Sequence, residues 1–136
     1  MTDTVASSGL AVRAGTFAFS LVLGIVYGSV ATLGHRNEIR IGDIVIPWGL
    51  AAALVGVLAL LLGLRLVAGG RLAAAGAAVG IVGTVALLTL PGPGGSVLVA
   101  GDIVGTVWAV GPALIAVLVV AWPSLPTRRP VAGDGA

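Results

Sequence analysis

The sequence predicts an all-α membrane protein with four transmembrane helices. Of its 136 residues, 58% are apolar and only 9% are charged. Soluble domains have about 45–50% apolar and about 25% charged residues, so this composition is typical of a protein embedded in lipid. The apolar residues also fall into four long runs. Each run is near the roughly 20 residues that a helix needs to cross the hydrocarbon of a bilayer.

The elements follow from where these runs begin and end. The predicted spans cover residues 14–34, 44–64, 72–90 and 103–122, which together form one transmembrane domain, residues 14–122. Residues 1–13 and 123–136 are small and polar, and the tail is rich in proline. We expect both segments to be disordered and cytoplasmic, because they cannot bury enough apolar surface to order themselves.

The arginines predict the orientation of the spans. Five of them fall in the N-terminal flank, the second loop and the tail, namely Arg13, Arg65, Arg71, Arg128 and Arg129. The first loop carries two and the third carries none. Basic residues accumulate on the cytoplasmic side, so both termini should be cytoplasmic in a bacterial inner membrane.

A cleaved signal peptide is the alternative for the first run, because Ser29-Val30-Ala31 resembles a cleavage site. The run is too long for an ordinary signal and continues past this site. The pattern therefore favours a retained span.

The tetrapeptide GDIV occurs twice, at residues 42–45 and 101–104, and each copy opens an apolar run on the predicted outer side. Trp48 and Trp108 follow at nearly the same distance. This repetition suggests two tandem helical hairpins, spans one with two and three with four. A pseudo-two-fold axis along the membrane normal would relate them.

Two interpretations of Asp43 and Asp102 stay open. Each can cap a helix, because an Asp before the first turn accepts a bond from a free backbone N–H and suits the positive end of the helix dipole. Alternatively, they meet in an outer-face polar cluster that binds a cation or a cationic head group. That candidate cluster comprises His35, Arg36, Glu38, Arg40, Asp43 and Asp102. A single His at a helix end is more often solvated or capping than a metal ligand.

Small residues predict where the helices pack, because association in lipid depends on close approach of backbones. The candidate packing residues are Ser20, Gly24, Gly28, Gly76, Gly80, Gly101 and Gly105. Pro112 should kink the fourth span. Trp48 and Trp122 fit interfacial anchors, whereas Trp108 should lie in the bundle.

The third predicted loop is unusual, because PGPGG is followed by the apolar run SVLVA at residues 96–100. Five residues are too few to cross a membrane. We expect this run to lie at the interface or to tuck into the mouth of the bundle.

The motifs of enzymes, cofactors and metal sites are missing from the sequence. It has no cysteine, no paired carboxylates, no HExxH and no Walker lysine. The central thirds of the spans have no ionisable side chain, which argues against a proton-coupled transporter. The net charge of only +2, with scattered arginines, argues against nucleic acid as a partner.

Several short motifs carry a resemblance. They are Gly24-xxx-Gly28, Gly34-His35-Arg36, Pro47-Trp48-Gly49-Leu50, Leu64-Arg65, Pro91-Gly92-Pro93-Gly94-Gly95-Ser96 and Gly101-Asp102-xx-Gly105-xx-Trp108. Over residues 14 to 122 the chain resembles an uncharacterised actinobacterial family of small four-span membrane proteins. The resemblance implies an inner-membrane protein with no established catalytic residues. The architecture is also similar to small multidrug resistance transporters, but those carry a Glu in the first span and this span has none.

These observations together favour a non-enzymatic structural or accessory protein without cofactors. It would act through helix contacts in the lipid bilayer, as a homo-oligomer or with a larger membrane partner. The alternative is a small transporter or permeation protein with an outer site around Asp43 and Asp102.

Overall fold

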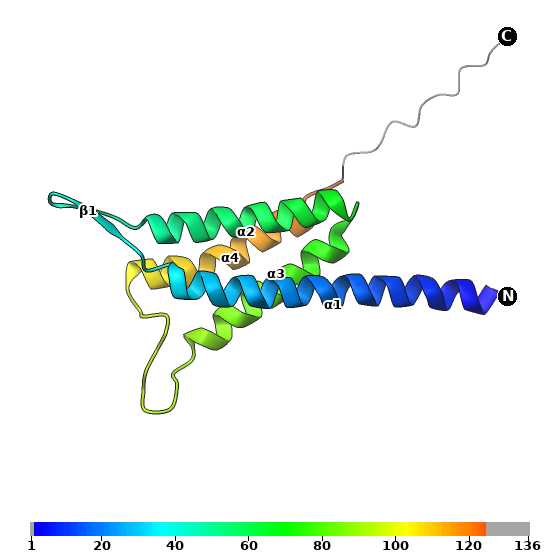
Figure 1. Ribbon diagram of the computed structural model, residues 1–136, viewed down its shortest axis with the longest axis horizontal. Helices are drawn as coiled ribbons and strands as arrows, with labels where there is room; N and C mark the ends of the chain where they lie inside the picture. The colour runs from blue at the N-terminus through cyan, green and yellow to red at the C-terminus, as the bar shows by residue number, and fades with distance from the viewer. Residues whose placement is uncertain (1, 125–136) are drawn as a thin grey trace, which may run out of the picture.

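The computed structural model describes residues 2–124 and contains four long helices and one small β-hairpin (Figure 1). The helices are α1 (Thr2–Gly34), α2 (Trp48–Val67), α3 (Arg71–Thr89) and α4 (Ile103–Ala121). Each is long and apolar enough to cross a membrane. The predicted class, an all-α protein with four candidate transmembrane helices, is therefore confirmed.

The first helix begins much earlier than the sequence predicted, at Thr2. The expected disorder of the N-terminal segment is therefore wrong for residues 2–13. Extension of an existing helix costs far less than starting one, and no proline interrupts this stretch. Asp3 also lies in the first turn, where it suits the helix dipole. Residues 125–136 of the predicted tail lie outside the described residues.

The second span begins later than predicted, because the segment before it forms an antiparallel hairpin of β1 (Ile39–Ile41) and β2 (Ile44–Ile46). Isoleucine and valine favour extended backbone, and Ile39 pairs with Ile46. Gly42 has φ +64° at the turn, a conformation that glycine adopts without strain. Pro47 follows directly and caps α2.

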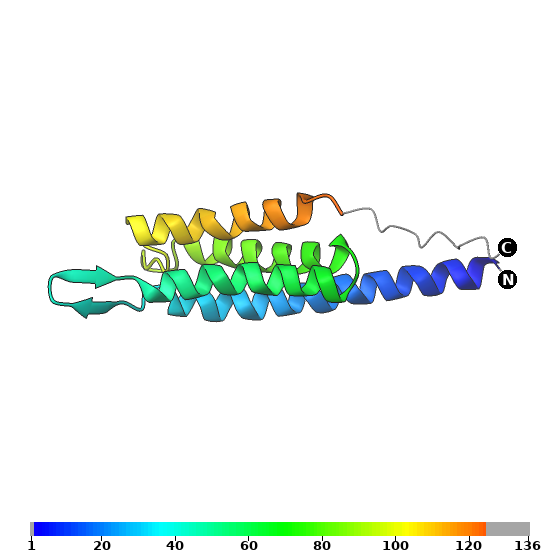
Figure 2. The same ribbon diagram turned by 90° about the horizontal axis from the view of Figure 1, so that it is seen from above.

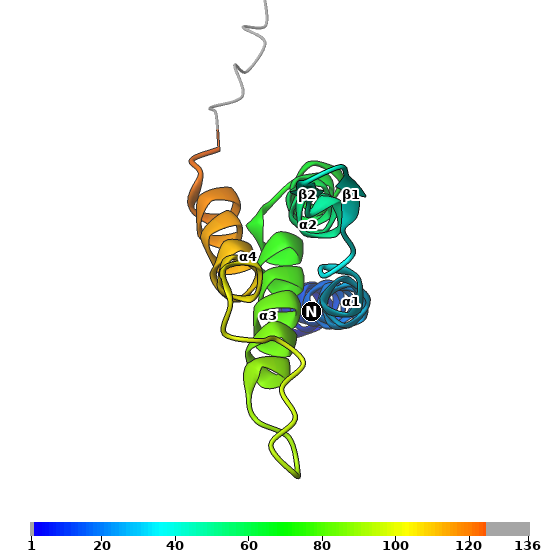
Figure 3. The same cartoon turned by 90° about the vertical axis from the view of Figure 1, so that its left-hand side faces the viewer.

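The helices surround α3, which lies between α1 and α4 in the end-on view, with α2 to one side (Figure 3). The largest helix contact is between α1 and α3, whereas α1 and α2 touch little. This corrects the expected tandem hairpins for the first two spans, because α3 and not α2 is the main partner of α1. The small residues of α1 pack against α3.

Close approach of backbones explains this interface. A Cβ on Gly24 would overlap the carbonyl oxygen of Ala77, and one on Gly80 would overlap the carbonyl of Leu21. Added atoms on Gly28 and Gly76 would also be crowded, by the Ile81 backbone and by Phe17 and Ser20 respectively, and Ser20 itself is buried. Ser20, Gly24, Gly28, Gly76 and Gly80 therefore pack helices, as predicted.

The two glycines of the second GDIV copy behave differently. A Cβ on Gly101 would meet nothing within 4 Å. Gly105 lies against the carbonyl of Ala100, in the loop that precedes its own helix. The prediction that these two glycines pack helices is wrong, because both lie where the chain turns into α4.

The core is centred on the fully buried side chains of Val57, Leu61, Ile81 and Trp108. The prediction that Trp108 lies in the bundle is confirmed. Pro112 is also buried, and α4 continues through it as one helix.

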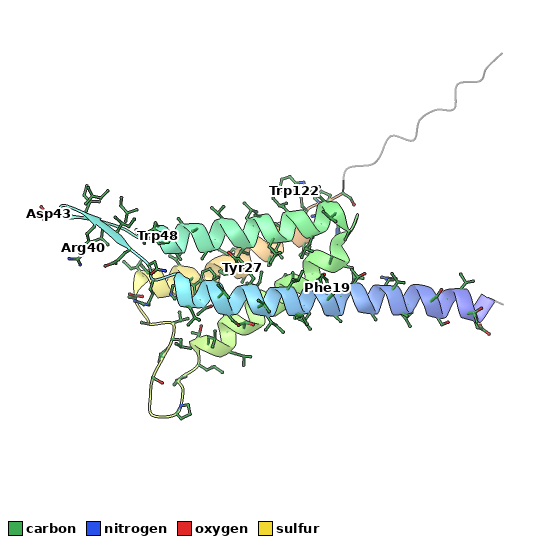
Figure 4. The ribbon with its side chains drawn as sticks, viewed as in Figure 1. Phe19, Tyr27, Arg40, Asp43, Trp48 and Trp122 are labelled. Carbon is green, nitrogen blue, oxygen red and sulfur yellow. The ribbon has the colours of Figure 1, made fainter. Side chains whose placement is uncertain are left out.

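The side chains at the bundle surface follow the sequence-based expectations in part. Trp48 and Trp122 are exposed near opposite ends of the bundle (Figure 4), where an interfacial anchor belongs.

In the loop before α4, Val99 is buried while Val97 and Leu98 are exposed. Only one residue of the SVLVA run therefore tucks into the core.

Candidate functional site

A polar cluster joins the end of α1 to the start of α4. We call it the hairpin-end cluster, because it lies at the same end of the bundle as the β-hairpin. It consists of Thr32, His35, Arg36, Asp102 and Trp108. Elsewhere α1 and α4 lie on different sides of α3 (Figure 3). The cluster is thus a direct link between the first and last helices.

His35 is completely buried against Trp108. The two rings stack with centroids 5.5 Å apart and planes inclined by 15°. The expectation of a solvated His is therefore wrong, whereas the alternative expectation, a capping His, agrees with the bond between its Nδ1 and the Thr32 carbonyl oxygen in the last turn of α1. Gly24, Gly28, Thr32 and His35 follow one another at helical spacing, so His35 continues the stripe that faces into the bundle. That spacing was the sequence signal for its burial.

The tautomer of His35 follows from its hydrogen bond. Nδ1 lies 2.5 Å from the Thr32 carbonyl oxygen. A carbonyl only accepts, so Nδ1 carries the hydrogen, and in the neutral imidazole Nε2 then presents its lone pair. Nε2 is buried and has no hydrogen-bond partner among the described residues. A buried polar atom without a partner is costly.

A second set of buried hydrogen bonds ties Trp108 to α1. The indole Nε1 donates to the Thr32 hydroxyl oxygen over 3.0 Å. That hydroxyl in turn donates to the Gly28 carbonyl oxygen over 2.6 Å. Polar bonds of this kind hold helices together in lipid, where water cannot compete for them. The pair specifies both the depth and the rotation of α4 relative to α1.

Asp102 caps α4, so the capping interpretation is confirmed for this residue. Its Oδ1 accepts from the Gly105 backbone N–H over 2.8 Å and from Arg36 Nη2 over 2.8 Å. The bond from Gly105 and the Arg36 guanidinium hold the pKa of Asp102 below its ordinary value. Both charged side chains remain about half exposed, which limits the strength of the pair.

Asp43 does not belong to this cluster. It sits in the turn at the tip of the β-hairpin, far beyond the start of α2 (Figure 4). Pro47 caps α2 without a side-chain bond, so the capping interpretation is wrong for Asp43. The structure therefore does not bring the two aspartates together. The first GDIV copy pairs with a preceding strand, and the second has no such partner.

The remaining members of the predicted cluster lie beside or on the hairpin, because Glu38 directly precedes β1 and Arg40 is part of it. Arg40 Nε lies 3.9 Å from Glu38 Oε1, with the Arg40 side chain largely exposed and the Glu38 side chain about half exposed. Among the described residues, no hydrogen bond or ion pair joins either side chain to His35. Within residues 2–124, no group of three or more His, Asp or Glu side chains could hold a metal ion.

The opposite end of the bundle carries contacts that the sequence did not reveal. Arg65 donates to the carbonyl oxygens of Val119 and Trp122, and Arg71 donates to Trp122 over 3.3 Å. The last carbonyls of a helix have no partner within it and carry its negative dipole end. The two arginines, interpreted from sequence as topology signals, thus also fasten the end of α4.

Four apolar helices packed around a common core define a multi-pass helical membrane protein. No family model, curated protein or solved structure matches the chain. Its function is therefore argued from its own residues.

Proposed function

We propose that the protein is a non-enzymatic component of the bacterial cytoplasmic membrane that acts through helix contacts. Both termini lie on the cytoplasmic side in this proposal. The start of α1 and the end of α4 are at the same end of the bundle (Figure 2), together with Arg65 and Arg71. Basic residues in short loops favour the cytoplasmic side, which supports this orientation.

The observation that carries the proposal is an uncovered face of α3. Three helices pack on α3, yet Val79, Gly83 and Leu87 remain exposed along one stripe. A groove of about 470 Å³ continues this face between α3 and α4. It is lined by Arg71, Ala75, Ala78, Val79, Ala116, Val117, Val120 and Ala121.

Small residues make this face suitable for another helix. Backbones in lipid associate where alanine and glycine let them approach, and a Cβ on Gly83 would meet nothing within 4 Å. The same chain uses such residues to join α1 to α3. The partner is a second copy of this chain or a larger membrane protein. The proposal needs no cofactor and no nucleic acid.

Single cysteines test the proposal directly, because the chain has none of its own. Gly83→Cys should form a disulfide between chains in native membranes if the partner is a second copy. Val55→Cys is the matched control, because Val55 is an exposed residue of α2 outside the groove. A photo-crosslinker at Val79 covers the case of a larger partner. A monomer in mild detergent with no crosslink from either position on α3 would contradict the proposal.

The alternative function, a small transporter with a site at Asp43 and Asp102, receives no support from this geometry. Asp43 is at the hairpin tip, and Asp102 is engaged by Arg36 and by the start of α4. Unchanged uptake and efflux in an Asp43→Asn, Asp102→Asn variant would remove this site. Loss of transport in that variant would instead support a transport site at these two residues.

A further inference from the structure

A pocket lies at the end of the bundle opposite the β-hairpin, where α2 ends, α3 begins and α4 ends. Its volume is about 640 Å³. Leu58 and Leu62 line it more than one turn before the end of α2, and Leu118 lines it within the last turn of α4. Arg65 lines it near the end of α2, and Arg71 lines it at the start of α3. The pocket is therefore apolar towards the middle of the helices and cationic at its rim.

The charges at the rim are not balanced. None of the residues that line the pocket is Asp or Glu. Arg65 is held by the carbonyls at the end of α4. Arg71 is exposed and makes a single long bond to Trp122, which leaves most of its five N–H donors without a partner among the described residues. A negatively charged ligand would find free donors here.

The first turn of α3 adds to this preference. Gly70 is its N-cap and offers no side-chain acceptor, so the first backbone N–H groups of α3 remain available beside Arg71. The N-terminus of a helix favours anions through these groups and through its dipole. Gly69 and Gly70 both line the pocket, and neither places a side chain over the rim.

We propose that this pocket binds an anionic phospholipid of the adjacent leaflet. The phosphate lies at Arg71 and the first turn of α3, and an acyl chain follows Leu58 and Leu62. The apolar wall distinguishes a lipid from a soluble anion, because Leu62 and Leu118 are exposed and continue the lipid-facing surface. Trp122, which also lines the pocket, is of the type found at the head-group level.

Brominated lipids test this proposal through tryptophan fluorescence. The full chain with Trp48→Phe is placed in phosphatidylcholine vesicles that contain either brominated phosphatidylglycerol or brominated phosphatidylcholine. Trp122 then reports on the pocket, because Trp108 is fully buried and Trp122 is 64% exposed. An arginine near a membrane surface strengthens anionic lipid binding about fivefold. Quenching by the brominated phosphatidylglycerol should therefore reach its midpoint at a severalfold lower mole fraction of brominated lipid than quenching by the brominated phosphatidylcholine.

Two matched variants locate the effect. Arg71→Gln should reduce the preference for the anionic lipid about fivefold. Arg13→Gln removes the same charge from an exposed position on α1 and should leave the preference intact. Equal quenching by both lipids, or a preference that survives Arg71→Gln, would overturn the proposal. A quenching preference that persists after Trp122→Phe would also overturn it, because the remaining signal would then come from Trp108, which does not line the pocket.

Discussion

Replacement of Gly24 by alanine should destabilise the protein more than its small size suggests. The added Cβ would overlap the Ala77 carbonyl oxygen and lie 2.9 Å from two further backbone atoms of Ala77. Backbone cannot rotate away as a flexible side chain can, so α1 and α3 must separate locally. Overpacking of this kind costs about 1–3 kcal/mol. We expect Gly24→Ala to fall in the upper half of that range, because Gly28 and Gly80 would lose contact as well.

Gly63→Ala is the control, since a Cβ there would meet nothing within 4 Å. The chemical change is identical, so the difference between the two variants isolates the helix contact. Gly63→Ala should be neutral or stabilising by up to about 1 kcal/mol through helix propensity. The assay is unfolding by a denaturing detergent in mixed micelles, followed by the loss of helical circular dichroism. Equal stability of the two variants would refute the packing argument.

Three further predictions concern the ends of the bundle. A double-mutant cycle of Trp108→Phe and Thr32→Val should give a coupling energy of about 0.6–1.7 kcal/mol in the same assay, and zero coupling would exclude the buried hydrogen bond. The lowered pKa of Asp102 means that its stabilising effect is present above its ordinary pKa of 3.8 and is lost as the pH falls through the lower folded value. The unfolding midpoint of the parent protein should therefore drop as the pH falls below 3.8, and the midpoint of Asp102→Asn should drop less. Identical pH profiles of the two proteins would contradict the ion pair between Asp102 and Arg36. Arg65→Gln should cost about 1 kcal/mol, because two carbonyls at the end of α4 lose a charged donor. Arg65→Lys should recover part of this stability. An unchanged unfolding midpoint in Arg65→Gln would show that the bonds from Arg65 do not stabilise the end of α4.

Much of the fold was predictable, because spacing of apolar residues is a local property of the sequence. The run from Ala14 to Gly34 and the capping role of Asp102 both follow from the residues themselves. The small-residue ladder of α1 correctly marked a packing face. It did not say which helix would fill that face, because several helices carry similar ladders.

The candidate site was less predictable, since it depends on how distant segments meet. The two GDIV copies look alike, yet one forms a hairpin with Ile39–Ile41 and the other caps a helix. That difference is set by the residues that precede each copy. The burial of His35 could be inferred only from its helical spacing after Gly28 and Thr32. Its stacking on Trp108 required the rotation of α4, which no local pattern specifies.

The most direct test of the account is whether α1 lies against α3 within one chain. A Cβ on Gly28 would lie 3.3 Å from the Cβ of Thr84, close to the separation of about 3.5–4.5 Å that a disulfide spans. The variant with Gly28→Cys and Thr84→Cys should therefore oxidise efficiently within a single chain and keep the mobility of a monomer. Oxidation only between chains, or none at all, would contradict the arrangement of the helices around α3.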